Sequence, residues 1–267
     1  MIKKNALETF LEGNKNVRSA LGLTTKNPVV TVMPIGKYIS SNPENLTSIK
    51  ELMKQAGDLL MLAGTGRGKT HAICTVFSQL KDEHCLLATP NKVQNLQNEK
   101  DSKNKEYKIK SVVGGDVVDI FNLNKQNSYS FVYDKANAFD KVFTTGRKVN
   151  LIIDEAHQMT EAYGYRNPAV KALMVLAERV KANGGSVIYM TATPGPLMHM
   201  QFDHILQFLP EDSSAPADKV TIYKVQGHSI DRRISGILYF SRSISIPVSR
   251  FSSPVDHCNS LSDIFRI

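Results

Sequence analysis

The segment "LMLAGTGRGKT", Leu60 to Thr70, constrains the fold of this 267-residue chain more than any other feature. An apolar run that breaks into glycines and then continues with helical spacing predicts a buried strand, a tight turn and a helix. Such a turn points several backbone N–H groups and the positive end of a helix dipole at one place. The sequence therefore predicts a strand, a turn and a helix with an anion site at the turn.

The residues of this turn are suited to binding a nucleotide. The glycines carry no Cβ, so the backbone can approach phosphate oxygens closely. Lys69 is expected to reach the β and γ phosphates, and the Thr70 hydroxyl to bind Mg²⁺. A glycine-rich turn with a surface lysine that binds nothing is the alternative. The residues predicted to bind ATP are Gly64, Thr65, Gly66, Arg67, Gly68, Lys69 and Thr70.

A second polar feature, "LIIDEAHQM", lies about 85 residues further along the chain. Asp154 and Glu155 follow an apolar strand that we expect beside the Leu60 strand, so both carboxylates would face the crevice at the carboxyl ends of the strands. Asp154 is expected to hold Mg²⁺ through water, and Glu155 to orient and deprotonate the water that attacks ATP. The solvated start of a loop is the alternative for two adjacent carboxylates.

Strands and helices alternate through most of the chain. The apolar runs predict strands at 28–33, 58–63, 85–90, 107–113, 129–134, 149–154 and 186–192. Helical spacing and end signals predict helices at 43–56, 70–80, 92–100, 135–143 and 168–183. Parallel neighbours need crossover connections, so this alternation predicts a doubly wound α/β domain with a mainly parallel sheet.

Composition and charge narrow the class of protein. The formal net charge is +8, and a basic surface of this kind attracts a polyanion such as nucleic acid. No apolar stretch approaches the roughly 20 residues of a membrane span, and the N-terminus lacks the apolar core of a signal peptide. We therefore expect a cytoplasmic protein without a membrane partner.

Cys74, Cys85 and Cys258 lack CxxC spacing, so neither a disulfide framework nor a zinc site is expected.

Together these motifs resemble the superfamily-2 helicases. The turn has Ala63 where the general P-loop pattern has glycine, and A-x-x-G-x-G-K-T is the form found in helicases. "DEAH" at 154–157 is the box that names one group of them, and "MTATP" at 190–194 matches their motif III. The resemblance covers most of 60–194 and implies a RecA-like motor domain that binds ATP and Mg²⁺.

The resemblance also implies contacts with a nucleic-acid strand. "ATPNK" is similar to motif Ia, although the usual P-T-R is replaced by P-N-K; "VVGGD" is similar to the glycine pair that follows, and "VFTTGR" to motif Ib. In the family these loops follow the phosphates of one strand, so binding should tolerate any sequence and depend on salt. The residues expected to contact nucleic acid are Pro90, Asn91, Gly114, Gly115, Thr144 and Thr145. Pro90, Asn91, Thr144 and Thr145 are expected to follow strand ends. Ordinary turns are the alternative for the glycine and threonine pairs.

Coupling between strand binding and hydrolysis is expected to depend on His157, Thr191 and Thr193. His157 is expected to hydrogen-bond one of the two threonines, although a lone histidine is more often structural. Lysines at 100, 103, 105, 108 and 110 form either part of a basic face or a solvated charge run.

Helicases of this superfamily use two RecA-like domains, and the second supplies an arginine finger. About 70 residues follow motif III, too few for a second such domain. We therefore expect an N-terminal extension at 1–44, a motor domain at 45–225, and at 226–267 a tail or the start of a missing second domain. The finger would then come from that second domain or from a partner chain.

Three functions remain open at this stage. The first is a motor that couples nucleic-acid-dependent ATP hydrolysis to translocation along, or unwinding of, single-stranded or duplex DNA or RNA. The second is a nucleotide-dependent module that binds nucleic acid without unwinding it. The third is a P-loop ATPase that acts on protein.

Overall fold

The computed structural model describes residues 6–102, 107–116, 118–164 and 166–211, and two short strands at 222–224 and 237–239. The chain divides into two compact units, Met1–Glu211 and Asp212–Ile267. In the second unit, β9 (Ile222–Lys224) and β10 (Ile237–Tyr239) form an antiparallel pair.

Several predictions fall on residues outside the described part of the chain. These are Cys258, the lysines at 103 and 105, and nearly all of the predicted tail at 226–267. The three other lysines of that run, at 100, 108 and 110, are exposed.

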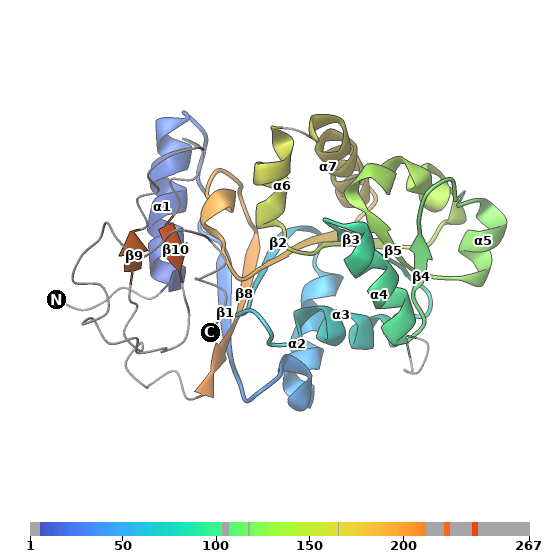
Figure 1. The fold of residues 1–267 in the computed structure, drawn as a ribbon, viewed down its shortest axis with the longest axis horizontal. Coiled ribbons are helices and arrows are strands. Elements are labelled where there is room, and N and C mark those ends of the chain that lie inside the picture. Colours follow the sequence, from blue (N-terminus) through green and yellow to red (C-terminus); the bar gives the residue numbers. More distant parts are fainter. Residues whose placement is uncertain are drawn as a thin grey trace, which may run out of the picture. The chain divides into compact units, whose positions relative to one another are not determined.

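The described residues of the first unit are organised around an eight-stranded sheet with the order β1-β8-β2-β7-β6-β3-β5-β4 (Figure 1). In that order the strands are β1 (Val29–Ile35), β8 (His204–Pro210), β2 (Gly57–Leu62), β7 (Ser186–Thr191), β6 (Val149–Ile153), β3 (His84–Thr89), β5 (Ser128–Val132) and β4 (Lys110–Val112). Every neighbouring pair is parallel. All carboxyl ends therefore lie along one edge of the sheet, and all amino ends along the other.

Helices cover both faces of this sheet (Figure 1). One face carries α1 (Ala6–Ala20), α5 (Ile120–Lys125), the 3₁₀ helix η2 (Tyr133–Thr145), α6 (His157–Tyr163) and α7 (Asn167–Ala182). The other face carries α2 (Pro43–Lys54), α3 (Lys69–Phe77) and α4 (Lys92–Ser102). The short 3₁₀ helices η1 (Ile39–Ser41) and η3 (Gly195–Leu197) lie in connecting segments.

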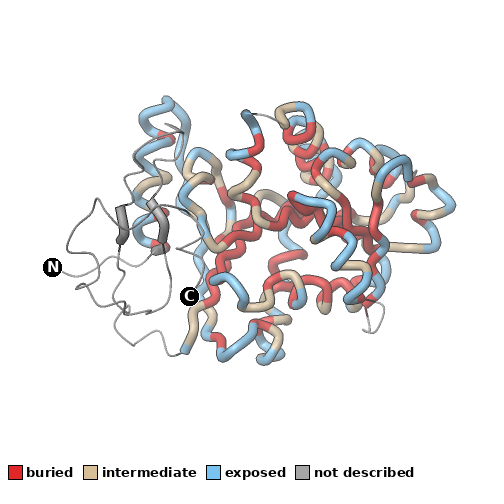
Figure 2. Tube along the Cα trace, in the orientation of Figure 1, coloured by how far each residue is buried: buried red, intermediate tan, exposed pale blue. Residues whose placement is uncertain are grey.

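The strands bury side chains on both of their faces. In β2, Leu60 and Leu62 belong to one apolar layer, and Leu59 and Met61 belong to the other. Figure 2 shows buried residues running along the middle of the sheet between the two helix layers. A strand covered on both faces is apolar at every position, which is why these strands are continuous apolar runs in the sequence.

Local signals account for the helix boundaries. The Asn42 side chain accepts a hydrogen bond of 2.9 Å from the Glu44 N–H and caps α2, and Pro43 occupies the first helical position. A cap of this kind stabilises a helix by about 1 kcal/mol. Pro168 lies in the first turn of α7, and Gly184, with a φ of 71°, follows its end. These features agree with the predicted helices.

The predicted fold class, a doubly wound parallel α/β domain, is confirmed, and two elements differ from the prediction. The segment predicted as an α-helix at 135–143 belongs to the 3₁₀ helix η2. Its buried residues Tyr133, Ala136, Phe139 and Val142 recur every third position, which matches the three residues per turn of a 3₁₀ helix. The strand β8, which lies between β1 and β2, was not predicted.

Among the described helices, none has both the length and the apolar character that crossing a membrane requires.

Candidate functional site

The glycine-rich turn connects β2 to α3, as predicted, and presents bare backbone at the carboxyl edge of the sheet. Gly66 and Gly68 have φ angles of 73° and 74°, in the left-handed region that glycine adopts without strain. Gly68 is the N-cap of α3. Ile39 donates its N–H to the carbonyl of Arg67 at 3.0 Å, which ties the turn to the segment after β1. The remaining turn residues, Gly64 and Thr65, are exposed.

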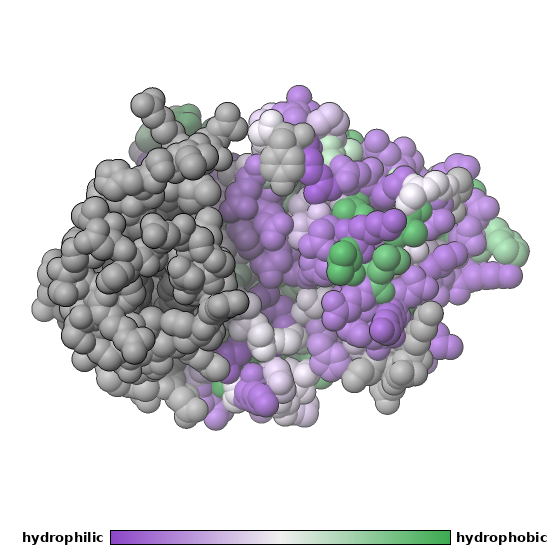
Figure 3. Space-filling model, viewed as in Figure 1, coloured by the Kyte–Doolittle hydropathy of each residue, from purple (hydrophilic) through white to green (hydrophobic). Residues whose placement is uncertain are grey.

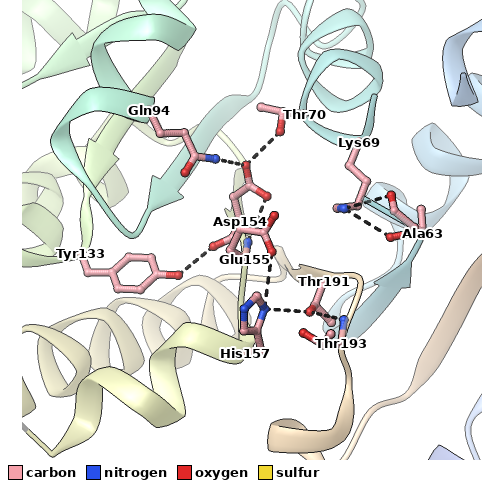
Figure 4. Close-up of polar contacts among 11 residues, drawn as sticks. Ala63, Lys69, Thr70, Gln94, Tyr133, Asp154, Glu155, His157, Thr191 and Thr193 are labelled. Atoms are coloured by element: carbon pink, nitrogen blue, oxygen red, sulfur yellow. Dashed lines mark hydrogen bonds and ion pairs between the residues drawn. The ribbon is translucent and has the colours of Figure 1, made fainter. Parts of the chain in front are cut away.

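Lys69 is the first residue of α3, and its side chain folds back over the turn (Figure 4). The side chain is 6% exposed, and its Nζ lies 3.2 Å from the Ala63 carbonyl oxygen and 3.4 Å from that of Gly64. Within the described part of the chain, it makes no ion pair with a carboxylate. The ammonium group is therefore desolvated beside neutral oxygens, a position that favours an anionic ligand.

Asp154 is buried at the end of β6, and donors from three elements surround its carboxylate (Figure 4). Oδ2 accepts hydrogen bonds from the Thr70 hydroxyl at 2.9 Å and from Gln94 Nε2 at 2.7 Å. Oδ1 accepts from the Glu155 N–H at 3.0 Å. Burial raises the pKa of this carboxyl, and the Thr70 hydrogen bond opposes the shift. A divalent cation here would favour the ionised form.

Glu155 has a φ of 48°, the one positive value among the described residues other than glycine. A side chain in the left-handed region costs about 1–2 kcal/mol. Hydrogen bonds on both sides hold the backbone in this conformation: the Asp154 N–H donates to Ala88 of β3, and the Ala156 N–H donates to Met190 of β7, both at 2.9 Å. Hydrogen bonds to the neighbouring strands therefore hold Glu155 in a backbone conformation that a glutamate would not adopt by itself.

His157 links the acidic pair to β7. Its Nδ1 lies 3.0 Å from Thr191 Oγ1 and 3.4 Å from Glu155 Oε2. The Thr193 N–H donates to Thr191 Oγ1 at 2.9 Å. The structure thus contains the predicted contact between His157 and Thr191, and Thr193 joins it through its backbone rather than its hydroxyl.

One expectation about this site is wrong. The strands that carry the turn and the acidic pair are not adjacent, because β7 lies between β2 and β6. Thr70 and Asp154 still meet: α3 connects β2 to β3, which lies beyond β7 and β6 in the sheet, and the Thr70 hydroxyl donates to Asp154 from the first turn of α3. The inserted strand also explains how Thr191 reaches both neighbours: its carbonyl accepts from the Ala63 N–H at 3.4 Å, and its hydroxyl contacts His157.

The residues predicted to contact nucleic acid fall into two groups. Pro90 and Asn91 follow β3, and Gly114 and Gly115 follow β4, so all four lie along the carboxyl edge. The expectation that Thr144 and Thr145 follow a strand end is wrong, because they end η2, which returns the chain to the amino edge. There Thr145 Oγ1 lies 3.0 Å from Nε2 of His84, the first residue of β3.

Sequence reasoning missed three side chains that organise the carboxyl edge. Gln94 of α4 binds Asp154, as described above. Tyr133 follows β5, is fully buried and donates its hydroxyl to the Asp154 carbonyl at 2.7 Å. Arg166, between α6 and α7, donates to the Pro90 carbonyl at 2.8 Å and pairs with Asp134. Tyr133 and Asp134 are the last two residues of the predicted strand at 129–134, as Asp154 is the last residue of the strand at 149–154, so the strand-end rule that identified Asp154 could have found them.

A fourth missed residue, Tyr38, lies beside the turn. Its side chain is 43% exposed, and a Cβ added to Gly68 would lie 3.6 Å from the ring. Lys37 Nζ lies 5.3 Å from the centre of the same ring. An exposed aromatic ring next to a phosphate site offers a surface on which a base can stack.

The residues present fit a nucleotide and a divalent cation. Gly66 faces open space, Gly68 faces the Tyr38 ring, and the desolvated Lys69 lies beside them. No group of three or more His, Cys, Asp or Glu side chains gathers as a metal cage among the described residues. Thr70 and Asp154 therefore suit an ion that takes its other ligands from phosphate and water, as Mg²⁺ usually does.

The sheet and its turn define a RecA-like P-loop domain. The family model for DEAD/DEAH box helicases matches residues 42–200, more than half of the chain. The chain belongs to this family, whose domain implies ATP binding.

Solved structures that match include the Hef helicase domain of Pyrococcus furiosus, with 20% identity and a TM-score of 0.46 over 68% of this chain and 41% of that one. Another is the DUF1998 helicase MrfA, with 16% identity and a TM-score of 0.42 over 76% of this chain and 33% of that one. The chain thus spans less than half the length of either. No curated protein sequence matches it at a significant level.

Proposed function

We propose that this chain is the ATP-binding motor domain of a DEAH-type helicase, in which strand-dependent ATP hydrolysis drives translocation along, or unwinding of, nucleic acid. The observation that carries the proposal is the hydrogen bond of 2.9 Å between Thr70 and Asp154. It joins the phosphate turn and the acidic box, which lie about 85 residues apart in the sequence, at one point.

The roles follow from the positions of the side chains. The bare backbone of the turn and Lys69 would bind the β and γ phosphates, and Thr70 and Asp154 would hold Mg²⁺. When bound, Mg²⁺ neutralises charge at the transferring phosphate. Glu155 would orient a water molecule and accept its proton as the water oxygen attacks the γ-phosphorus and the bond to the β-phosphate oxygen breaks. Tyr38 would stack on the base.

A nucleic-acid strand is proposed to cross the same edge of the sheet. Pro90 and Asn91 lie closest to the acidic box along this edge, and Gly114 and Gly115 lie further out, beyond β5. Backbone N–H groups and the Asn91 amide can bind phosphates without recognising bases. Thr144 and Thr145 are left out of this surface, because they lie at the amino edge.

The path from the strand to the chemistry would include His157, Thr191 and Thr193, which already form one network. A second RecA-like domain, in the same protein or in a partner chain, is proposed to supply an arginine finger, worth about 10³–10⁵ in rate in related ATPases.

ATP turnover by the purified chain with single-stranded DNA, RNA, duplex or no nucleic acid tests the proposal. Stimulation by a strand, weaker at higher salt, is the expected result. Strand binding without turnover would favour the binding module instead, and turnover indifferent to nucleic acid would favour an ATPase that acts on protein.

Two variants with matched controls test the assigned roles. Lys69→Ala should abolish nucleotide binding, whereas Lys81→Ala, at an exposed lysine beyond the end of α3, should not. Glu155→Gln should bind ATP and lose turnover, whereas Glu161→Gln, at an exposed position of α6, should keep both. Normal hydrolysis by Glu155→Gln would show that another group is the base.

A further inference from the structure

The strongest unexplained contact at the carboxyl edge is the one between Gln94 and the acidic box. Gln94 Nε2 donates to Asp154 Oδ2 at 2.7 Å, and the same oxygen accepts the Thr70 hydroxyl at 2.9 Å. Figure 4 shows the two donors approaching the carboxylate from α4 and α3. The position of this metal-site carboxylate therefore depends on a helix outside both the turn and the box.

The same helix begins at the loop proposed to bind nucleic acid. Asn91 precedes α4, and its Oδ1 accepts the Gln94 backbone N–H at 2.8 Å, which makes it the cap of the helix. The single Thr89 hydroxyl donor is shared by the carbonyls of Asn91, at 3.3 Å, and Phe131, at 3.2 Å, which anchors the loop on β3 and β5. Asn91 itself is exposed.

We propose that Gln94 is a positioning residue that couples strand binding to the metal-nucleotide site, through Asn91 on one side and Asp154 on the other. This inference rests on the proposed function. A phosphate bound at Asn91 would order the first turn of α4, and Gln94 would then hold Asp154 in place beside Thr70. The proposed path from the nucleic acid to the Asp154 carboxylate thus includes only two residues, Asn91 and Gln94.

The coupling must also act in the opposite direction. If a strand raises the affinity for Mg·nucleotide by some factor, Mg·nucleotide raises the affinity for the strand by the same factor. A glutamine that only filled space or satisfied a buried carboxylate would contribute to stability and to nucleotide affinity with and without a strand, and would leave this factor unchanged. The factor therefore distinguishes a coupling role from a structural one.

The same helix supplies a matched control. Gln97 lies one turn further along α4 and is exposed. Gln94→Met and Gln97→Met remove the same amide from the same helix with little change in volume or helix propensity. Gln94→Asn keeps the amide but shortens the side chain by one methylene, so it tests whether reach matters.

The experiment measures binding of a fluorescent, non-hydrolysable ATP analogue with Mg²⁺, without and with a saturating single-stranded oligonucleotide. The ratio of the two dissociation constants is the coupling factor. We expect Gln94→Met and Gln94→Asn to lower it at least about threefold, and Gln97→Met to leave it unchanged. Thermal unfolding of each variant confirms that it is folded.

The outcomes separate this inference from the proposed function. If the wild-type chain fails to bind the analogue or the strand, the proposed function fails and takes the inference with it. If the wild type binds both and its coupling factor is one, or if Gln94→Met retains the wild-type factor, the inference alone is overturned.

Discussion

Two lysines at opposite edges of the sheet, Lys181 and Lys69, have opposite surroundings. At the amino edge, Lys181 Nζ lies 2.6 Å from Asp58 Oδ2 and 2.8 Å from Glu178 Oε1, so the lysine and the carboxylates satisfy one another. At the carboxyl edge, Lys69 contacts only backbone carbonyl oxygens in its described hydrogen bonds, and Asp154 contacts a hydroxyl and an amide.

The difference distinguishes a structural lysine from a ligand-binding one. Paired charges at the amino edge join α7 to β2 and stabilise the fold. Lys69 and Asp154 at the carboxyl edge are desolvated without a described ion pair, an unfavourable state that a ligand can relieve and that is typical of a binding site. The same kinds of residue therefore serve stability at one edge and ligand binding at the other.

The largest effect is expected at Asp154. Asp154→Asn should lower strand-stimulated ATP turnover at least about 100-fold, because the metal it helps to hold contributes several kcal/mol of charge stabilisation. Its melting temperature without nucleotide should not fall, since burial already disfavours the charged form. Asp58→Asn removes the half-buried aspartate of the amino edge and should retain turnover. Equal losses of turnover in the two variants would contradict the assignment of a metal-binding role to Asp154 and a structural role to Asp58.

The next effect concerns pH and His84, at the start of β3. Burial, aided by the charge of Arg147, lowers the pKa of His84 from 6.5 to about 4. The unfolded chain therefore binds more protons than the folded chain between these values, and stability should fall as the pH drops from about 6.5 to 4, by at most about 3 kcal/mol. Denaturant unfolding at several pH values measures this slope, and His84→Gln should reduce it. If the substitution leaves the slope unchanged, a group other than His84 causes the pH dependence of stability.

A smaller loss is expected from breaking the ion pair of the amino edge. Lys181→Met should destabilise the fold by about 1–2 kcal/mol at neutral pH, because it leaves the half-buried Asp58 carboxylate without its cation. Burial already raises the pKa of Asp58, and the loss of Lys181 should raise it further, so the penalty should shrink as the pH falls and the carboxyl becomes protonated. ATP turnover should persist. Thermal melts at neutral and acidic pH test this, and a penalty independent of pH would argue for lost packing.

The smallest effect on stability is expected at Lys69. Lys69→Met should leave the free energy of unfolding within about 0.5 kcal/mol or raise it slightly, because it removes a buried charge whose described hydrogen bonds reach only neutral carbonyl oxygens. The same substitution should abolish nucleotide binding. Unfolding without nucleotide, measured beside Lys181→Met, tests the contrast. A large destabilisation by Lys69→Met would mean that this charge supports the apo fold.

The sequence predicted the fold class and the meeting of Thr70 and Asp154 because glycine turns and strand ends are local features. The order of the strands is not local. An apolar run specifies a buried strand and leaves its neighbours open, so the place of β7 between β2 and β6 could not be predicted.

The direction in which side chains point is a second property that the sequence could not predict. Gln94 lies inside a predicted helix, and which face of that helix meets Asp154 depends on how α4 packs on the sheet. The expected position of Thr144 and Thr145 was wrong because they come just before β6, and residues that precede a parallel strand lie at the amino edge of the sheet.

The left-handed backbone at Glu155 limits which side chains can replace it. Glycine, asparagine and aspartate tolerate that conformation best, and none of them carries a carboxylate on a side chain as long as that of glutamate. Selection for a well-folded chain and selection for chemistry would therefore favour different residues at this position. A substitution that relieves the backbone strain at this position would therefore preserve the fold and abolish ATP hydrolysis.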